Sequence, residues 1–134
     1  MKRLVSPIIM LFLLTVLLVG CQADDTASTP TLNAKIAKAT GFTTTYSEYT
    51  AEYDDPKVIT QLKHIVDGAT REPGIVNVMT PHYYMEVPGS KAYSYFLWLG
   101  TEGQTSSIMH TADTHTLHTI TEEDTKILRE LIPH

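Results

Sequence analysis

Hydrophobic residues between positions 58 and 69 recur at spacings of three and four, which is the period of an amphipathic α-helix. Asp54 or Asp55 can cap this helix, and Pro56 suits the first helical position, where its missing N–H would be unpaired anyway. Gly68 weakens the last turn of this helix, and Pro73-Gly74 is expected to stop it. The predicted buried stripe comprises Val58, Ile59, Leu62, Ile65, Val66 and Ala69.

A second helical pattern lies near the C-terminal end of the sequence. The hydroxyl of Thr121 can cap this helix, and Asp124 follows three residues later. Glu122 and Glu123 add negative charge to the first turn, where the helix dipole favours it. The predicted buried stripe, which Pro133 ends, comprises Ile127, Leu128, Leu131 and Ile132.

Segments rich in Thr, Tyr, Phe, Val and Ile predict β-strands. Phe96 to Leu99 is apolar at every position, so we expect it to be a central strand with a helix on one side. The predicted class is α+β, with a mostly antiparallel sheet of about five strands packed against two helices in a single domain of residues 34–134. The strand segments are 34–40, 49–53, 75–79, 81–87, 91–99, 106–110 and 116–120.

Pro88 and Gly89 separate two of these segments and suggest a hairpin turn. If they are the central turn residues, Glu86 lies opposite Lys91 and Tyr84 opposite Tyr93, which gives one charge pair and one aromatic pair. Pro-Gly favours a type II turn, which matches strand twist less well than the primed types, so a longer loop is the alternative.

Residues 1–20 have the profile of a secretory signal, with Lys2 and Arg3 before seventeen uncharged residues. The segment ends in Leu18-Val19-Gly20-Cys21, which resembles the bacterial lipobox. This resemblance implies cleavage before Cys21, a lipid on its sulfur with palmitate among the acyl chains, and attachment to the extracytoplasmic face of the cell membrane. An uncleaved membrane anchor is the alternative. Residues 21–33 are polar and are expected to form a flexible spacer.

Charge and cysteine content narrow the function classes. Removal of Lys2 and Arg3 leaves eight Lys and Arg against fifteen Asp and Glu, a formal net charge of −7. Such an acidic domain is a poor partner for nucleic acid, whose phosphates are bound by Lys and Arg. Cys21 is the only cysteine, and lipidation would consume it, so no disulfide or thiol chemistry is expected.

His110, Asp113, His115 and His118 lie within nine residues, and these side-chain types bind zinc or copper when they converge. His115 and His118 would project to opposite faces of a strand, so we expect no metal site and no cofactor. Convergence in the fold would instead allow a metal-binding protein or a small hydrolase. The residue pool for those alternatives comprises His82, Glu86, His110, Asp113, His115 and His118.

Seven tyrosines and Trp98 are a second unusual feature. Exposed aromatic residues would suit binding to a sugar or to a partner's apolar patch, and Tyr84, Tyr93 and Tyr95 are the candidates. The alternative is that these rings form the cross-strand packing of the sheet. The sequence contains no G-x-S-x-G motif and no glycine-rich phosphate loop, so no catalytic residue is assigned.

The order of elements from about Ile36 to Ile132 resembles the YhfM-like domain of small Bacillus-type lipoproteins. The resemblance implies a Gram-positive cell surface and supplies no activity or site residue. We therefore expect a lipid-anchored envelope protein that binds an envelope protein or glycan without catalysis. The matching segments are Tyr95 to Leu99, Ser107 to Met109, Thr111 to Thr116 and Leu128 to Ile132.

Overall fold

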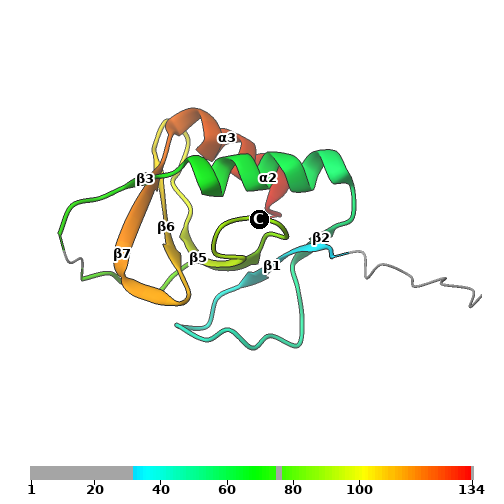
Figure 1. Ribbon diagram of the computed structural model, residues 1–134, viewed down its shortest axis with the longest axis horizontal. Coiled ribbons are helices and arrows are strands. Elements are labelled where there is room, and N and C mark those ends of the chain that lie inside the picture. Colours follow the sequence, from blue (N-terminus) through cyan, green and yellow to red (C-terminus); the bar gives the residue numbers. More distant parts are fainter. Residues whose placement is uncertain (1–31, 75–76, 134) are drawn as a thin grey trace, which may run out of the picture. The chain divides into compact units, whose positions relative to one another are not determined.

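The computed structural model describes residues 32–74 and 77–133 of the chain. These residues form seven β-strands and two α-helices (Figure 1). The elements in chain order are β1 (Ala34–Lys38), β2 (Ala51–Tyr53), α2 (Pro56–Gly68), β3 (Thr70–Arg71), β4 (Tyr83–Glu86), β5 (Ser94–Trp98), β6 (Ser106–His110), β7 (Asp113–Ile120) and α3 (Glu122–Leu131).

All seven strands belong to one antiparallel sheet in the order β2-β1-β4-β5-β6-β7-β3. The α+β class is confirmed, and β5 is the central strand, as its continuous apolar sequence predicts. The expected number of about five strands is wrong. The sheet gains β3, whose two exposed residues carry no strand pattern, because the chain leaving α2 pairs Thr70 with Thr119 and Arg71 with His118.

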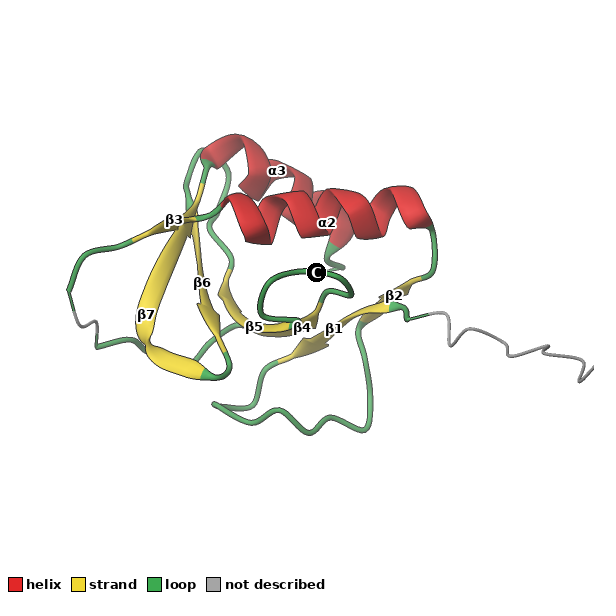
Figure 2. Ribbon diagram, viewed as in Figure 1, coloured by secondary structure: helices red, strands yellow, loops and turns green. Residues whose placement is uncertain are grey.

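Both helices pack on the same face of the sheet, which we call the helix-bearing face (Figure 2). The side chain of Asp55 accepts a hydrogen bond from the Lys57 N–H at 2.9 Å, and Thr121 Oγ1 accepts one from the Asp124 N–H at 3.2 Å. Both predicted helices are thus confirmed together with their caps. The buried residues of this face are Ala34, Ile36, Leu62, Ile65, Val66, Met85, Val87, Tyr95, Leu97, Ile108, Ile120, Leu128 and Ile132.

The opposite face of the sheet, which we call the second face, has its own buried cluster of Ala37, Tyr84, Phe96 and Met109. No helix among the described residues covers it. Residues 39–50, between β1 and β2, cross it instead (Figure 2). The rings of Tyr46 and Tyr84 stack at 4.9 Å, and Phe42 meets Phe96 edge-on at 5.2 Å. Residues 39–50 therefore cover the buried cluster of the second face, as the two helices cover the helix-bearing face.

The connection between β4 and β5 is longer than the predicted two-residue turn. Glu86 pairs with Ser94 and Tyr84 pairs with Phe96, so the predicted pairs with Lys91 and Tyr93 are wrong. The longer loop is the alternative that the Pro-Gly sequence left open.

Two turns in series make up this longer loop. Gly89 has a φ of +76°, and the Ser90 N–H donates to the Val87 carbonyl at 3.2 Å, as expected for a type II turn around Pro88-Gly89. Three more residues follow before the Val87 N–H closes the loop by donating to the Tyr93 carbonyl at 2.7 Å. The twist mismatch of the first turn explains why β5 does not begin directly after it.

Two other strand predictions need correction. The predicted strand 75–79 is wrong for Asn77 to Met79, which form no strand, and residues 75 and 76 lie outside the described part of the chain. Val78 packs against the second face without joining the ladder. β7 begins at Asp113 rather than Thr116, so the connection from β6 shrinks to Thr111 and Ala112.

The predicted signal segment and Cys21 lie outside the described residues, as does the spacer up to residue 31. Within the described ranges, neither helix has the length and apolar content that a membrane crossing requires.

Candidate functional site

His82 lies apart from the other candidate histidines. It immediately precedes β4, and its Nδ1 accepts a hydrogen bond from the Leu99 N–H at 3.1 Å. The pairing of β4 with β5 places His82 opposite Trp98. Trp98 lies three residues along β5 from Tyr95, and Tyr95 is the β5 partner of His110. Three strand residues span about 10 Å, so His82 and His110 occupy different parts of the sheet.

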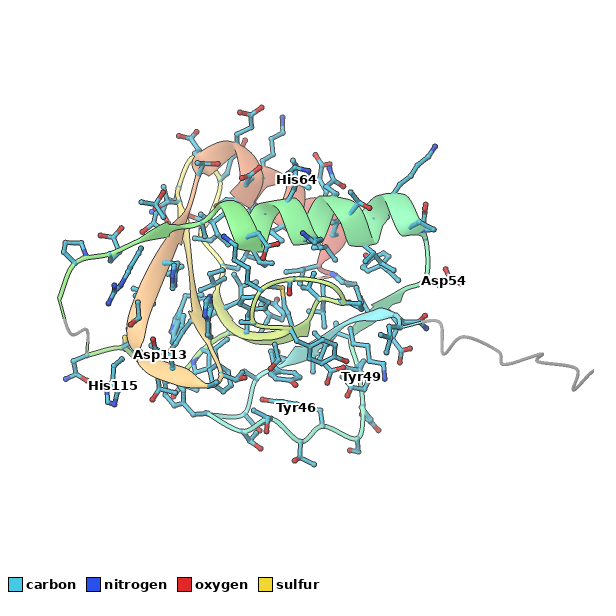
Figure 3. The ribbon with its side chains drawn as sticks, viewed as in Figure 1. Tyr46, Tyr49, Asp54, His64, Asp113 and His115 are labelled. Atoms are coloured by element: carbon cyan, nitrogen blue, oxygen red, sulfur yellow. The ribbon has the colours of Figure 1, made fainter. Side chains whose placement is uncertain are left out.

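Asp113 and His115 are exposed at the start of β7 (Figure 3). The Asp113 carboxylate accepts a hydrogen bond from the His115 backbone N–H at 3.1 Å. A hydrogen bond from the side chain of Thr116 lowers the pKa of Asp113, and the His115 N–H lowers it further. Asp113 therefore fixes the backbone at the beginning of the strand.

The structure brings the rings of His110 and His118 into contact, and Asp113 is the β7 partner of His110 at the turn between β6 and β7. The rings of His110 and His118 stack with centroids 4.6 Å apart and planes 8° from parallel. Imidazole lone pairs lie in the ring planes, so stacked rings direct them side by side rather than toward a common ion. No group of three potential His, Cys, Asp or Glu ligands converges within residues 32–74 and 77–133. The expectation that no metal binds stays a prediction.

The three candidate tyrosines have different roles. Tyr95 is fully buried, and its hydroxyl donates to Ser90 Oγ at 2.9 Å and accepts from the Ala92 N–H at 3.1 Å, which holds the loop after β4. Tyr84 is 3% exposed and belongs to the core of the second face. Tyr93 is 42% exposed and is the one of the three that a ligand can reach directly.

Tyr84 and Tyr93 share one hydrogen-bond acceptor. The Tyr84 hydroxyl donates to Oε1 of Glu86 at 3.1 Å, and the Tyr93 hydroxyl donates to Oε2 at 3.4 Å. Burial raises the pKa of both phenols, and the negative charge of Glu86 raises each further. The two phenols therefore stay protonated and act as hydrogen-bond donors to Glu86.

The backbone at Tyr93 has a conformation that bulky residues rarely adopt. Its φ is +63°, the one positive value at a non-glycine residue in the described part of the chain. The Ser94 N–H donates to the Ala92 carbonyl at 2.7 Å, which closes a three-residue turn centred on Tyr93. Turns of this kind with positive φ are strained.

Lys35 and Tyr49 complete the site. Lys35 pairs directly with Glu86 across β1 and β4, so the two side chains share the second face. The Lys35 ammonium lies 4.9 Å from the centroid of the Tyr49 ring, within cation–π range. Figure 3 labels Tyr49 and Tyr46 on the loop that crosses this face. We call Lys35, Tyr49, Tyr84, Glu86 and Tyr93 the Glu86 cluster.

Sequence reasoning found part of this cluster. Tyr84 and Tyr93 were binding candidates, and Glu86 belonged to the hydrolase pool. Lys35 and Tyr49 were missed, because the pairing of β1 with β4 joins residues about fifty positions apart. The available signal was the position of Lys35 between the apolar residues of β1, which places a charged side chain on the second face.

Comparison with known proteins adds the family. A family model described as YhfM protein matches residues 33–134 of the chain. No curated protein and no solved structure matches the chain.

Proposed function

We propose that this chain, which belongs to the YhfM protein family, is a non-catalytic binding module. A lipid on Cys21 would hold it at the extracytoplasmic face of the cell membrane. Its partner is an envelope protein or glycan. The lipobox-like sequence before Cys21 supports the lipid anchor. One acyl chain attaches a protein to a membrane only marginally, whereas two or more attach it firmly.

The Glu86 cluster is the observation that carries the binding function. It presents a carboxylate, an exposed tyrosine ring and a lysine on one face of a rigid sheet, from segments that are distant in the sequence. Exposed aromatic and charged groups positioned by a scaffold are typical of recognition surfaces. Strained backbone at Tyr93 supports the same interpretation, since such conformations concentrate where ligands are held.

The lack of a hydrogen-bonded histidine–carboxylate pair among the described residues of the hydrolase pool supports binding over catalysis, although His110 and Asp113 are neighbours in the sheet. General acid–base chemistry requires its groups within hydrogen-bond reach of one reacting atom. Among the described residues, no hydrogen bond or ion pair joins a histidine ring to a carboxylate. His82 accepts a hydrogen bond from the N–H of Leu99, just after β5, whereas the rings of His110 and His118 contact each other.

The predicted spacer sets how far the module can reach. Gln22 to Asn33 comprises twelve residues, which span at most about 40 Å when fully extended. A flexible chain of this length has a typical end-to-end distance of about 20 Å. The partner we propose is therefore a component of the membrane surface or of the envelope layer next to it.

Crosslinking on intact cells tests the proposal. The lipidated protein should yield a crosslinked envelope protein or glycan that an unanchored form, secreted with a non-lipoprotein signal peptide in place of residues 1–21, does not yield. Equal recovery from both forms, or recovery of nothing from either, would count against a membrane-anchored binding module.

A further inference from the structure

We infer that the Glu86 cluster is a binding site for a primary ammonium group. This inference rests on the proposed binding function and assigns the chemistry of the ligand. The ammonium would lie between the Glu86 carboxylate, to which the Tyr93 hydroxyl donates, and the face of the Tyr49 ring, in place of the ammonium of Lys35.

Four chain segments converge at the site. Lys35 comes from β1, Tyr49 from the loop between β1 and β2, and Glu86 from the end of β4. Tyr93 approaches from the loop that precedes β5. Stacking of Tyr46 on Tyr84 at 4.9 Å fixes the loop that carries Tyr49 against the sheet.

The charge of the site suits a cation that donates hydrogen bonds. A carboxylate offers about four lone-pair positions, and the two phenols use one on each oxygen of Glu86. The remaining positions can accept N–H bonds, which a primary ammonium supplies and a quaternary ammonium does not. The negative face of the Tyr49 ring, over which the Lys35 ammonium lies, attracts the same positive charge.

Lys35 already shows where an ammonium group is favourable. Its Nζ lies 4.9 Å from the Tyr49 centroid, yet it forms no ion pair with Glu86, its direct partner in the ladder. A lysine head group sits on a flexible four-carbon stem, so it can leave this position while the stem stays on the sheet. Lys35 is therefore an internal competitor for the site.

The strain at Tyr93 fits the same role. A φ of +63° directs the exposed ring back toward Glu86, where its hydroxyl reaches Oε2. A residue in extended backbone at this point would continue β5 toward the loop. The strained turn thus keeps the Tyr93 hydroxyl at the Glu86 carboxylate.

Titration of the full chain with n-butylammonium chloride tests the inference. The isotope-labelled protein would be held in micelles of an uncharged, amine-free detergent and followed by the amide NMR signals of Lys35, Tyr49, Glu86 and Tyr93. We expect saturable shifts at these four residues. Sodium chloride at equal ionic strength and n-butanol, which has the same length without charge, should leave them unshifted.

Three variants test which charged side chain determines the affinity for the ammonium group. Glu86→Gln should weaken binding by about tenfold or more, because it removes the only carboxylate within the cluster. Lys35→Gln should tighten binding by about threefold, because it removes the internal competitor. Glu123→Gln is the matched control: Glu123 is an exposed carboxylate on α3, which packs on the opposite face of the sheet, so affinity should stay within about twofold.

A second arm identifies the source of the amine. In nanodiscs containing a lipid with a primary amine headgroup, the same four signals shift without added butylammonium if the ligand is a membrane lipid. In nanodiscs of a quaternary ammonium lipid they shift only when butylammonium is added. If the ligand is a soluble or polymer-bound amine, butylammonium is needed in both.

Absence of saturable shifts in every arm, or equal shifts with n-butanol, would overturn the inference. If Glu86→Gln does not fold, Lys35→Gln decides, and unchanged or weaker binding by that variant would overturn it as well. Failure here together with successful crosslinking on cells would leave the binding module standing with a different ligand. Amine binding without any crosslinked partner would instead refute the proposed function alone.

Discussion

The imidazole rings of His110 and His118 lie stacked on adjacent strands, 4.6 Å apart. The ring of Tyr95 meets His110 edge-on at 5.3 Å, and Nδ1 of His118 is buried without a partner among the described residues. Burial lowers the pKa of His118. Positive charge on the nearby side chains of His110, Arg71 and Lys91 lowers it further. His118 is therefore held in its neutral form.

The free energy of unfolding should fall as the pH falls below about 6.5. The pKa of His118 in the folded state lies below its ordinary value of 6.5, to which it returns on unfolding, although Asp113 partly opposes the shift. Between these two values the unfolded chain binds more protons, so acidification favours unfolding, whereas stability is complete above 6.5. Urea unfolding at several pH values measures the slope of the free energy of unfolding against pH.

His118→Gln should flatten that slope. His115→Gln is the matched control, because His115 is an exposed histidine on the same strand and should leave the slope unchanged. Identical pH profiles for His118→Gln and the wild type would show that another group controls the acid response.

Tyr46→Phe should stabilise the protein by about 0.5–1 kcal/mol. The Tyr46 hydroxyl is buried and has no hydrogen-bond partner among the described residues, and such a group carries a desolvation penalty. The stacked contact with Tyr84 would remain. Thermal and urea unfolding measure the change. A loss of stability would mean that the hydroxyl is hydrogen-bonded in solution.

Trp98→Ala should destabilise the protein by about 2–3 kcal/mol, less than the roughly 3–5 kcal/mol typical of a fully buried tryptophan. Trp98 is half-buried on the second face, where it meets Phe42 at 6.2 Å and donates from Nε1 to the Met79 carbonyl at 2.9 Å. Denaturant unfolding is the measurement. A change under about 1 kcal/mol would show that these contacts contribute little in solution.

The helices could be predicted because their signals are local. Asp55 and Thr121 cap within three residues of their own positions, and each apolar stripe follows within the next turns. The register of β4 and β5 could not be predicted, because it depends on the strained turn at Tyr93, and no sequence rule favours positive φ at a tyrosine. The length of a loop decided which residues face each other.

The covering of the second face also escaped prediction. Phe96 to Leu99 indicated a strand with apolar contacts on both sides, which is confirmed for Phe96 and Leu97. The elements that supply those contacts on the second face are residues 39–50, which have no periodicity. Long-range pairing brings them there, and one sequence alone does not reveal it. The resemblance to the YhfM family was the most specific result of sequence reasoning, and it is confirmed over residues 33–134.

Cys21 should carry a diacylglycerol on its sulfur and should be the first residue of the mature protein. A cationic start, an apolar run and a lipobox-like ending precede it in the order typical of a lipoprotein signal. Mass spectrometry of the N-terminal peptide from membrane-extracted protein checks this. Cys21→Ala should release the protein from the membrane or leave it uncleaved. An unmodified Cys21 thiol in the membrane-bound protein would contradict the lipid anchor.

Site-specific photocrosslinking on living cells tests most directly whether the second face is the binding surface. A photoreactive phenylalanine analogue would replace Tyr49 in the Glu86 cluster in one strain and His64 on the exposed side of α2 in another (Figure 3). We predict a crosslinked envelope component from position 49 that is absent from position 64 and is lost in a Glu86→Gln background. Crosslinking from position 64 alone, or equally from both positions, would contradict the account.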